Sequence, residues 1–124
     1  MPQTVEVDEA RGLILCRSWD TITTQDLEAS RQHILRAHGD TGLQRVLVDA
    51  VAETRLPMVL ELYDFGEELA RTIGTAVRFA MVVSPQTAAD REFLANVARN
   101  RGAVIRVFDD FDKAYDHLAR APAD

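Results

Sequence analysis

The stretch Val46-Leu47-Val48-Asp49-Ala50-Val51, followed after a short connection by Pro57-Met58-Val59-Leu60-Glu61-Leu62-Tyr63-Asp64-Phe65, decides how the chain is organised. Its first part predicts a strand buried on both faces, because the run is almost continuously apolar. A loop through Glu53 and Thr54 is expected next. The second part predicts a helix whose first turns are apolar on nearly every side. A helix needs an apolar stripe only about 100° wide to cover a sheet. The excess apolar surface therefore predicts a further contact with a partner protein, a lipophilic ligand or a membrane surface.

Length and composition limit the classes of protein to which the chain can belong. Its 124 residues and 13.8 kDa fit one domain, which we place at residues 1–120 with a C-terminal tail at 121–124. The formal net charge of -6 argues against nucleic acid as a partner. It also argues against a purely electrostatic attachment to anionic lipids, which carry the same sign of charge, and we expect membrane contact to be peripheral at most.

Signals for export or membrane insertion are missing from the sequence. No apolar run approaches the roughly 20 residues that a membrane-spanning helix requires. The start of the chain has no basic segment followed by an apolar one, so we expect no signal peptide. Cys16 is the sole cysteine, which excludes an intrachain disulfide. We therefore expect a cytoplasmic protein.

The remaining hydrophobic patterns predict a regular alternation of strands and helices. Further strands are expected around Val5 to Val7 and at residues 13–19, 76–83 and 104–108. Further helices are expected from Thr23 or Thr24 to Gly39 or Gly42, over residues 87–100, and after Asp109 or Asp110. The order β-β-α-β-α-β-α-β-α predicts an α/β fold. It has a mostly parallel five-stranded sheet, an N-terminal antiparallel hairpin and four helices.

Motifs for catalysis or cofactor binding are not found. The sequence has neither a dinucleotide-binding glycine pattern nor a phosphate-binding loop. His33 and His38 are five residues apart and His117 is distant, a spacing that does not predict a metal site. Cys16 lies between Leu15 and Arg17 in a predicted strand, which indicates a buried, unreactive thiol. We therefore expect no metal, no cofactor and no enzymatic activity.

Asp49 is the carboxylate of most interest, because it is expected at the end of a central strand, where ligands of α/β proteins gather. A phosphate-accepting role is disfavoured, since the last strand has Arg106 and Phe108 where a receiver domain needs a lysine. A structural role, in which Asp49 accepts hydrogen bonds from nearby amides, is favoured. A small enzyme that uses Asp49 with Arg55 or Arg78 remains an alternative.

Three segments carry a resemblance to a known family: Arg45-Val46-Leu47-Val48-Asp49, Arg78-Phe79-Ala80-Met81-Val82-Val83, and Val107-Phe108 followed by Ala114 and Leu118. With the order of elements, they resemble the STAS domain and, within it, the SpoIIAA-like proteins of bacteria. STAS domains that antagonise anti-sigma factors are switched by phosphorylation of a serine at the start of the second helix. The corresponding residues here are Leu56-Pro57-Met58-Val59, which carry no hydroxyl. We therefore expect no phosphorylation; Thr54 is the nearest hydroxyl, and helix capping is its expected role. For the SpoIIAA-like branch, the resemblance implies binding of small lipophilic ligands or reversible membrane association.

The predicted helix after Asp49 is the expected binding element. Met58, Leu62, Phe65, Leu69 and Ile73 form one helical stripe that we assign to the core, whereas Leu56, Val59, Leu60 and Tyr63 fall largely off it. The residues expected to contact a ligand or a partner are Asp49, Thr54, Leu56, Met58, Val59, Leu60, Leu62 and Tyr63. The leading hypothesis is a non-enzymatic module that binds a protein partner or a small lipophilic ligand there. The alternatives are a homodimer formed through the same helix and burial of this helix between neighbouring helices.

Overall fold

The computed structural model describes residues 2–120, so the predicted tail at 121–124 lies outside the described residues. Its strands are β1 (Gln3–Asp8), β2 (Leu13–Thr21), β3 (Arg45–Arg55), β4 (Arg78–Val83) and β5 (Val104–Phe108). Its helices are α1 (Thr24–Thr41), α2 (Val59–Ile73), α3 (Ala88–Asn100) and α4 (Phe111–Arg120). The predicted element order is confirmed.

The strands form one sheet in the order β1-β2-β3-β4-β5. β1 and β2 are the antiparallel hairpin, and all other neighbours are parallel. The sheet therefore has the predicted mixed topology, with β3 at its centre.

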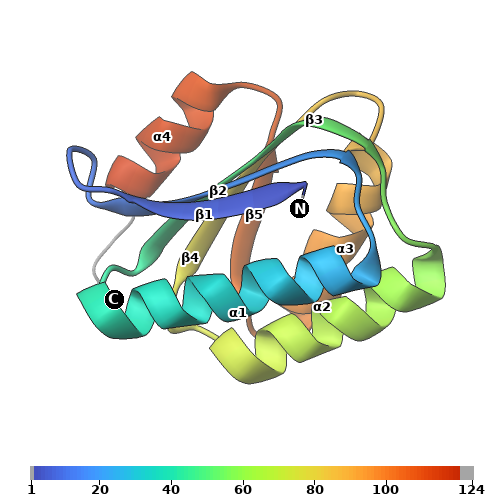
Figure 1. The fold of residues 1–124 in the computed structure, drawn as a ribbon, viewed down its shortest axis with the longest axis horizontal. Helices are drawn as coiled ribbons and strands as arrows, with labels where there is room; N and C mark the ends of the chain where they lie inside the picture. Colours follow the sequence, from blue (N-terminus) through green and yellow to red (C-terminus); the bar gives the residue numbers. More distant parts are fainter. Residues whose placement is uncertain (1, 121–124) are drawn as a thin grey trace.

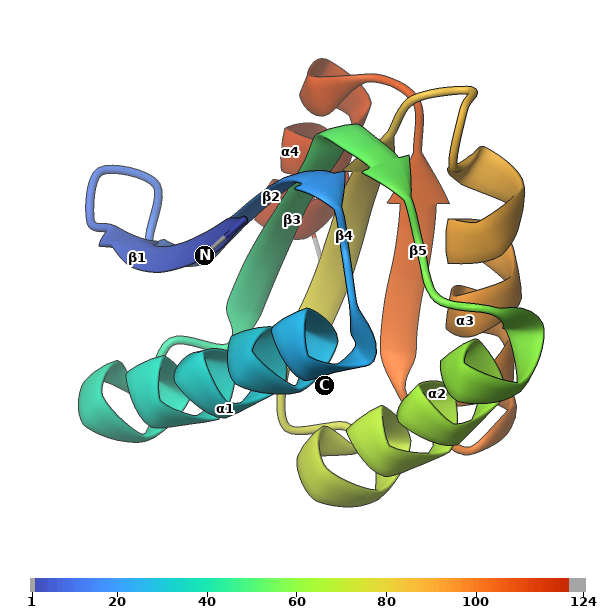
Figure 2. The ribbon, with the colours of Figure 1, turned by 45° about the vertical axis from the view of Figure 1, so that its right-hand side comes forward.

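Helices cover the two faces of the sheet unequally (Figures 1 and 2). α1, α2 and α3 lie on one face, and their apolar side chains meet residues such as Cys16, Val48 and Met81 in the larger core. α4 lies alone on the other face, where Ala114 and Leu118 pack on the sheet. α1 and α2 lie side by side, and α2 also packs against α3.

The ends of α1 follow from local chemistry. Thr23 is the N-cap: its Oγ1 accepts a hydrogen bond from the Asp26 amide at 3.1 Å, and the Asp26 carboxylate accepts one from the Thr23 amide at 2.9 Å. Gly42 ends the helix with φ at 77°, a left-handed conformation that glycine adopts without strain. Of the two predicted stops, Gly42 is therefore the one used.

β3 is longer than the sequence predicts, and the predicted loop through Glu53 and Thr54 is wrong. β3 pairs with β4 as far as Ala50, and its remaining residues pair with β2 alone. The register shifts from Arg17–Asp49 to Trp19–Ala52, so three steps along β3 match two along β2. Such a bulge exchanges the faces to which the following side chains point. The extension carries the chain beyond the sheet to the start of α2.

Candidate functional site

The start of α2 presents large apolar side chains to solvent. The N-cap residue is Met58, so no hydroxyl caps this helix. Met58 is 79% exposed, Val59 57% and Leu60 78%, and Tyr63, one turn later, is 37% exposed. Isolated exposed apolar residues are common, but a run of three consecutive ones is unfavourable in a soluble domain unless it serves a function. We call Met58, Val59, Leu60 and Tyr63 the apolar tip.

Predictions for three residues at or before the start of this helix are corrected. Met58 was assigned to the core stripe but is exposed, because the helix begins only at Val59 and Met58 lies before its first turn. Leu56 was expected off the core but is buried, because the segment between β3 and α2 places its side chain in the larger core. Leu62 is completely buried, which confirms its assignment to the core stripe, so the prediction that it also contacts a partner is wrong for this conformation.

Polar contacts hold the apolar tip in place. Glu61 Oε1 accepts a hydrogen bond from the Met58 amide at 3.3 Å, and Glu61 Oε2 accepts one from Thr24 Oγ1 at 3.1 Å. Tyr63 accepts a hydrogen bond through its hydroxyl oxygen from Arg101 Nη2 at 2.6 Å. Arg101 also donates to Glu67 at 2.7 Å, and this carboxylate raises the pKa of Arg101. The first turns of α2 are therefore tied both to α1 and to the C-terminal end of α3.

Asp49 and Thr54, the two polar residues predicted for the site, lie in β3 and not in the apolar tip. Thr54 is exposed within β3 and does not cap α2. Asp49 lies inside β3 rather than at its end, where its Oδ1 accepts a hydrogen bond from the Val51 amide at 3.3 Å. Its Oδ2 lies 3.9 Å from Nε of Arg17, so the ion-pair partner is an arginine that the sequence did not single out. The hydrogen bond agrees with the structural role expected for Asp49, because it satisfies an amide at the bulge.

A buried ion pair, not predicted from the sequence, lies under the helices. Glu53 is 1% exposed and Arg91, on α3, is 4% exposed. Arg91 Nε donates to Glu53 Oε1 at 3.0 Å, and Arg91 Nη2 donates to Glu53 Oε2. Ser18 Oγ donates to the same carboxylate, and Arg91 Nη1 points to Met81 Sδ at 3.8 Å. Strict alternation counted from Val46 would point Glu53 to the face of the sheet that α4 covers. The β3 bulge instead turns it toward α3.

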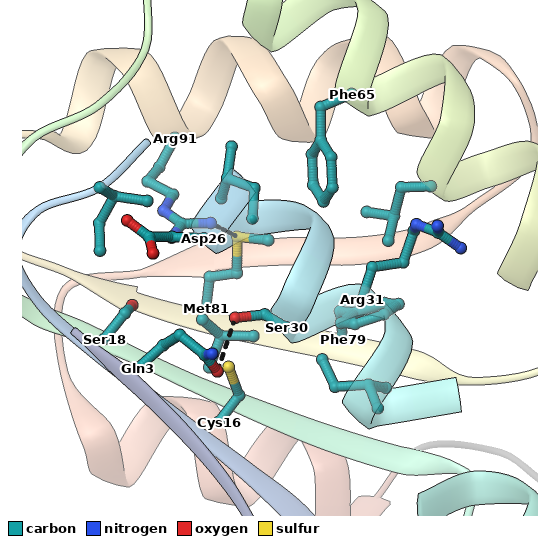
Figure 3. A pocket seen from close by; sticks show the side chains of 15 residues that line it. Gln3, Cys16, Ser18, Asp26, Ser30, Arg31, Phe65, Phe79, Met81 and Arg91 are labelled. Carbon is teal, nitrogen blue, oxygen red and sulfur yellow. Dashed lines mark hydrogen bonds between the residues drawn. The ribbon is translucent and has the colours of Figure 1, made fainter. Parts of the chain in front are cut away.

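A small cavity lies between α1, α2 and the sheet, beside this ion pair (Figure 3). Most of the exposed lining is apolar, charged side chains lie at its margins, and Ser30 Oγ donates to Gln3 Oε1 at 3.2 Å. The lining residues are Gln3, Cys16, Ser18, Ile22, Asp26, Leu27, Ser30, Arg31, Ile34, Val48, Phe65, Leu69, Phe79, Met81 and Arg91. The volume of the cavity is about 30 Å³, room for only one or two waters.

The cysteine in this cavity has the character that the sequence predicts. Cys16 is buried, and burial raises the pKa of its thiol, with a smaller opposing effect from the side-chain hydrogen bond to Ser30. The thiolate is therefore disfavoured at neutral pH. Over residues 2–120, no three His, Cys, Asp or Glu side chains are grouped to hold a metal ion. None of the helices described is both long and apolar enough to cross a bilayer.

Comparisons with known proteins identify the fold. No protein-family model matches the sequence, and no curated protein matches it significantly. One similar solved structure is an uncharacterized DUF3478-family protein with a SpoIIAA-like fold from Shewanella loihica PV-4. The two share 18% identity over 94% of this chain and 93% of that chain, with a TM-score of 0.64. A second is the anti-sigma factor antagonist SpoIIAA in its unphosphorylated form, at 15% identity over 95% of this chain and 98% of that one, with a TM-score of 0.56. The chain therefore has the STAS-type, SpoIIAA-like fold that its sequence resembles.

Proposed function

We propose that this chain is a non-enzymatic, SpoIIAA-like regulatory module that binds a partner protein at the apolar tip. The exposure of Met58, Val59 and Leu60 carries the proposal. Covering one such side chain contributes about 1.5–3 kcal/mol. Glu61 holds the Met58 backbone amide and Arg101 holds the Tyr63 hydroxyl, so the backbone and one side chain of the tip are already ordered before binding.

The similar SpoIIAA structure supports a protein as the partner, since that protein is described as an anti-sigma factor antagonist. The tip also lies at the start of α2, the position at which STAS antagonists carry their phosphorylated serine. With Met58 as N-cap, this chain has no hydroxyl to modify there. We therefore propose an interaction that is not switched by a kinase at this position.

A second candidate function is retention of a small lipophilic ligand in the cavity beneath α1 and α2. Its mainly apolar lining, with the polar pair Gln3 and Ser30, favours a small and mostly apolar molecule. The cavity volume of about 30 Å³ is too small for a long acyl chain unless the two helices move apart. Native mass spectrometry of the protein purified from its host tests this, because a retained molecule adds its mass to the folded chain.

Site-specific photo-crosslinking in host cells tests the leading proposal. A photoreactive residue replaces Leu60 in one variant and Gln32, an exposed polar position on α1, in the control variant. We expect a discrete protein adduct from position 60 that is missing from position 32 and is lost when Met58→Ser is added. Equal labelling from both positions contradicts the proposal. An adduct with the mass of two copies indicates the homodimer instead.

A further inference from the structure

An open acidic groove lies beside the apolar tip, between the first turns of α1 and of α2. Its floor is Phe65, which is buried. The groove is lined by Thr24, Glu28, Glu61, Asp64, Phe65 and Glu68. Glu61 belongs both to this groove and to the framework of the tip, since it bonds to the Met58 amide. The two features therefore form one continuous surface.

The acidic groups of this groove are only partly neutralised by the chain itself. Glu28 pairs with Arg31 at 2.7 Å, and Glu68 pairs with Arg71. Among residues 2–120, Glu61 and Asp64 form no ion pair with a lysine, arginine or histidine, and Glu61 has only the neutral donors described above. Covering such carboxylates with an apolar partner removes water without replacing its hydrogen bonds, which is unfavourable. A partner that brings a cation avoids this cost and gains specificity.

We propose that the partner presents a segment in which lysine or arginine residues flank apolar ones. The apolar residues cover Met58, Val59 and Leu60, and the basic ones lie in the groove against Glu61 and Asp64. This inference rests on the proposed function and names the chemistry of its partner. The charge pattern disfavours other occupants. A second copy of the chain docked through α2 brings like charges together, and an anionic membrane repels them.

Two synthetic peptides test the charge requirement. Both carry the same leucine face, and one has lysines where the other has glutamates. Their affinities for the full chain are measured by fluorescence anisotropy at low and high salt. We expect the lysine peptide to bind at least about ten times more tightly, with a preference that shrinks as salt increases. Equal affinities, or tighter binding to vesicles containing phosphatidylglycerol than to the lysine peptide, overturn the proposal.

Charge-neutralising variants locate the effect. The double variant Glu61→Gln/Asp64→Asn keeps a side chain at position 61 that can still cap α2. The matched control is Glu9→Gln/Asp40→Asn, which removes the same net charge at exposed positions outside the groove. We expect the groove variant to lose at least about five-fold of the affinity for the lysine peptide, and the control to lose less than two-fold. Similar losses in both variants overturn the proposal.

The same variants distinguish a failure of this inference from a failure of the proposed function on which it rests. If Glu61→Gln/Asp64→Asn leaves the adduct from position 60 unchanged while Met58→Ser removes it, the apolar tip binds a partner that is not basic, and the inference is wrong. If position 60 gives no adduct beyond that of position 32, the proposed function itself is wrong. Loss of the adduct in both variants supports both proposals.

Discussion

Replacing Arg91 by methionine tests the buried ion pair. In the folded protein, Arg91 supplies two hydrogen bonds to the Glu53 carboxylate, and among residues 2–120 the one other donor to it is Ser18 Oγ. Both partners are almost fully buried. Methionine retains much of the side-chain length but leaves Glu53 without a counter-ion. Breaking such a pair on one side costs about 3–5 kcal/mol. A native domain has a total stability of about 5–15 kcal/mol, so the loss is a large part of it.

Urea unfolding followed by the fluorescence of Trp19 measures this effect, because Trp19 is the sole tryptophan. We expect Arg91→Met to unfold at a much lower urea concentration than the wild type. The double variant Glu53→Leu/Arg91→Met is the control, and it should recover most of the loss because both charges are gone. If Arg91→Met alone lies within about 1 kcal/mol of the wild type, the ion pair is not the buried, mutually dependent unit inferred from its geometry.

Four further changes have expected outcomes that the same unfolding assay measures. Gly66→Ala should cost about 1–3 kcal/mol, because its Cβ would lie 2.9 Å from Val97 Cγ1, and adding Val97→Ala should relieve most of that cost. Thr23→Ala should cost about 1 kcal/mol through loss of the α1 capping box, and an unchanged stability would contradict that assignment. Partial burial lowers the pKa of His117, helped by Arg106 and by other arginines, so its folded form binds fewer protons than its unfolded form. The wild type should therefore lose stability as the pH falls below about 6.5, and His117→Gln should lose less of it between pH 7.5 and pH 5.5. Leu60→Ser should change stability by no more than about 0.5 kcal/mol, since this side chain is exposed, and a large loss would show that it has a packing role.

The fold could be predicted from the sequence because its signals are local. The alternation of apolar strands with amphipathic helices gives the order of elements, and the Thr23–Asp26 capping pair places the start of α1 within one residue. Parallel connections then allow few topologies. The end of β3 was misplaced, because Glu53 and Thr54 are polar and polar residues usually end a buried strand. Here the polar side chain of Glu53 is satisfied by Arg91, 38 positions further along the chain, and no local pattern reports such a contact.

The candidate site was predicted in outline but not residue by residue. The excess apolar character of the segment from Leu56 to Tyr63 locates the region, and Val59 and Leu60 are exposed as expected. Helical periodicity assigned Met58 to the core because the helix was taken to begin at Pro57, whereas it begins at Val59. The acidic groove depends on how α1 packs beside α2, so the position of Glu28 relative to Asp64 could not be obtained from either helix alone.

The extra residue in β3 has a consequence for comparing this chain with distant relatives. Deleting one residue between Asp49 and Ala52 would remove this bulge and turn Glu53 to the opposite face of the sheet, away from Arg91. A relative that lacks the insertion should therefore also lack the acid–arginine pair, or carry its acid one position away. An alignment that places this gap elsewhere will pair residues from opposite faces of the sheet as far as the second register shift, which follows Glu53.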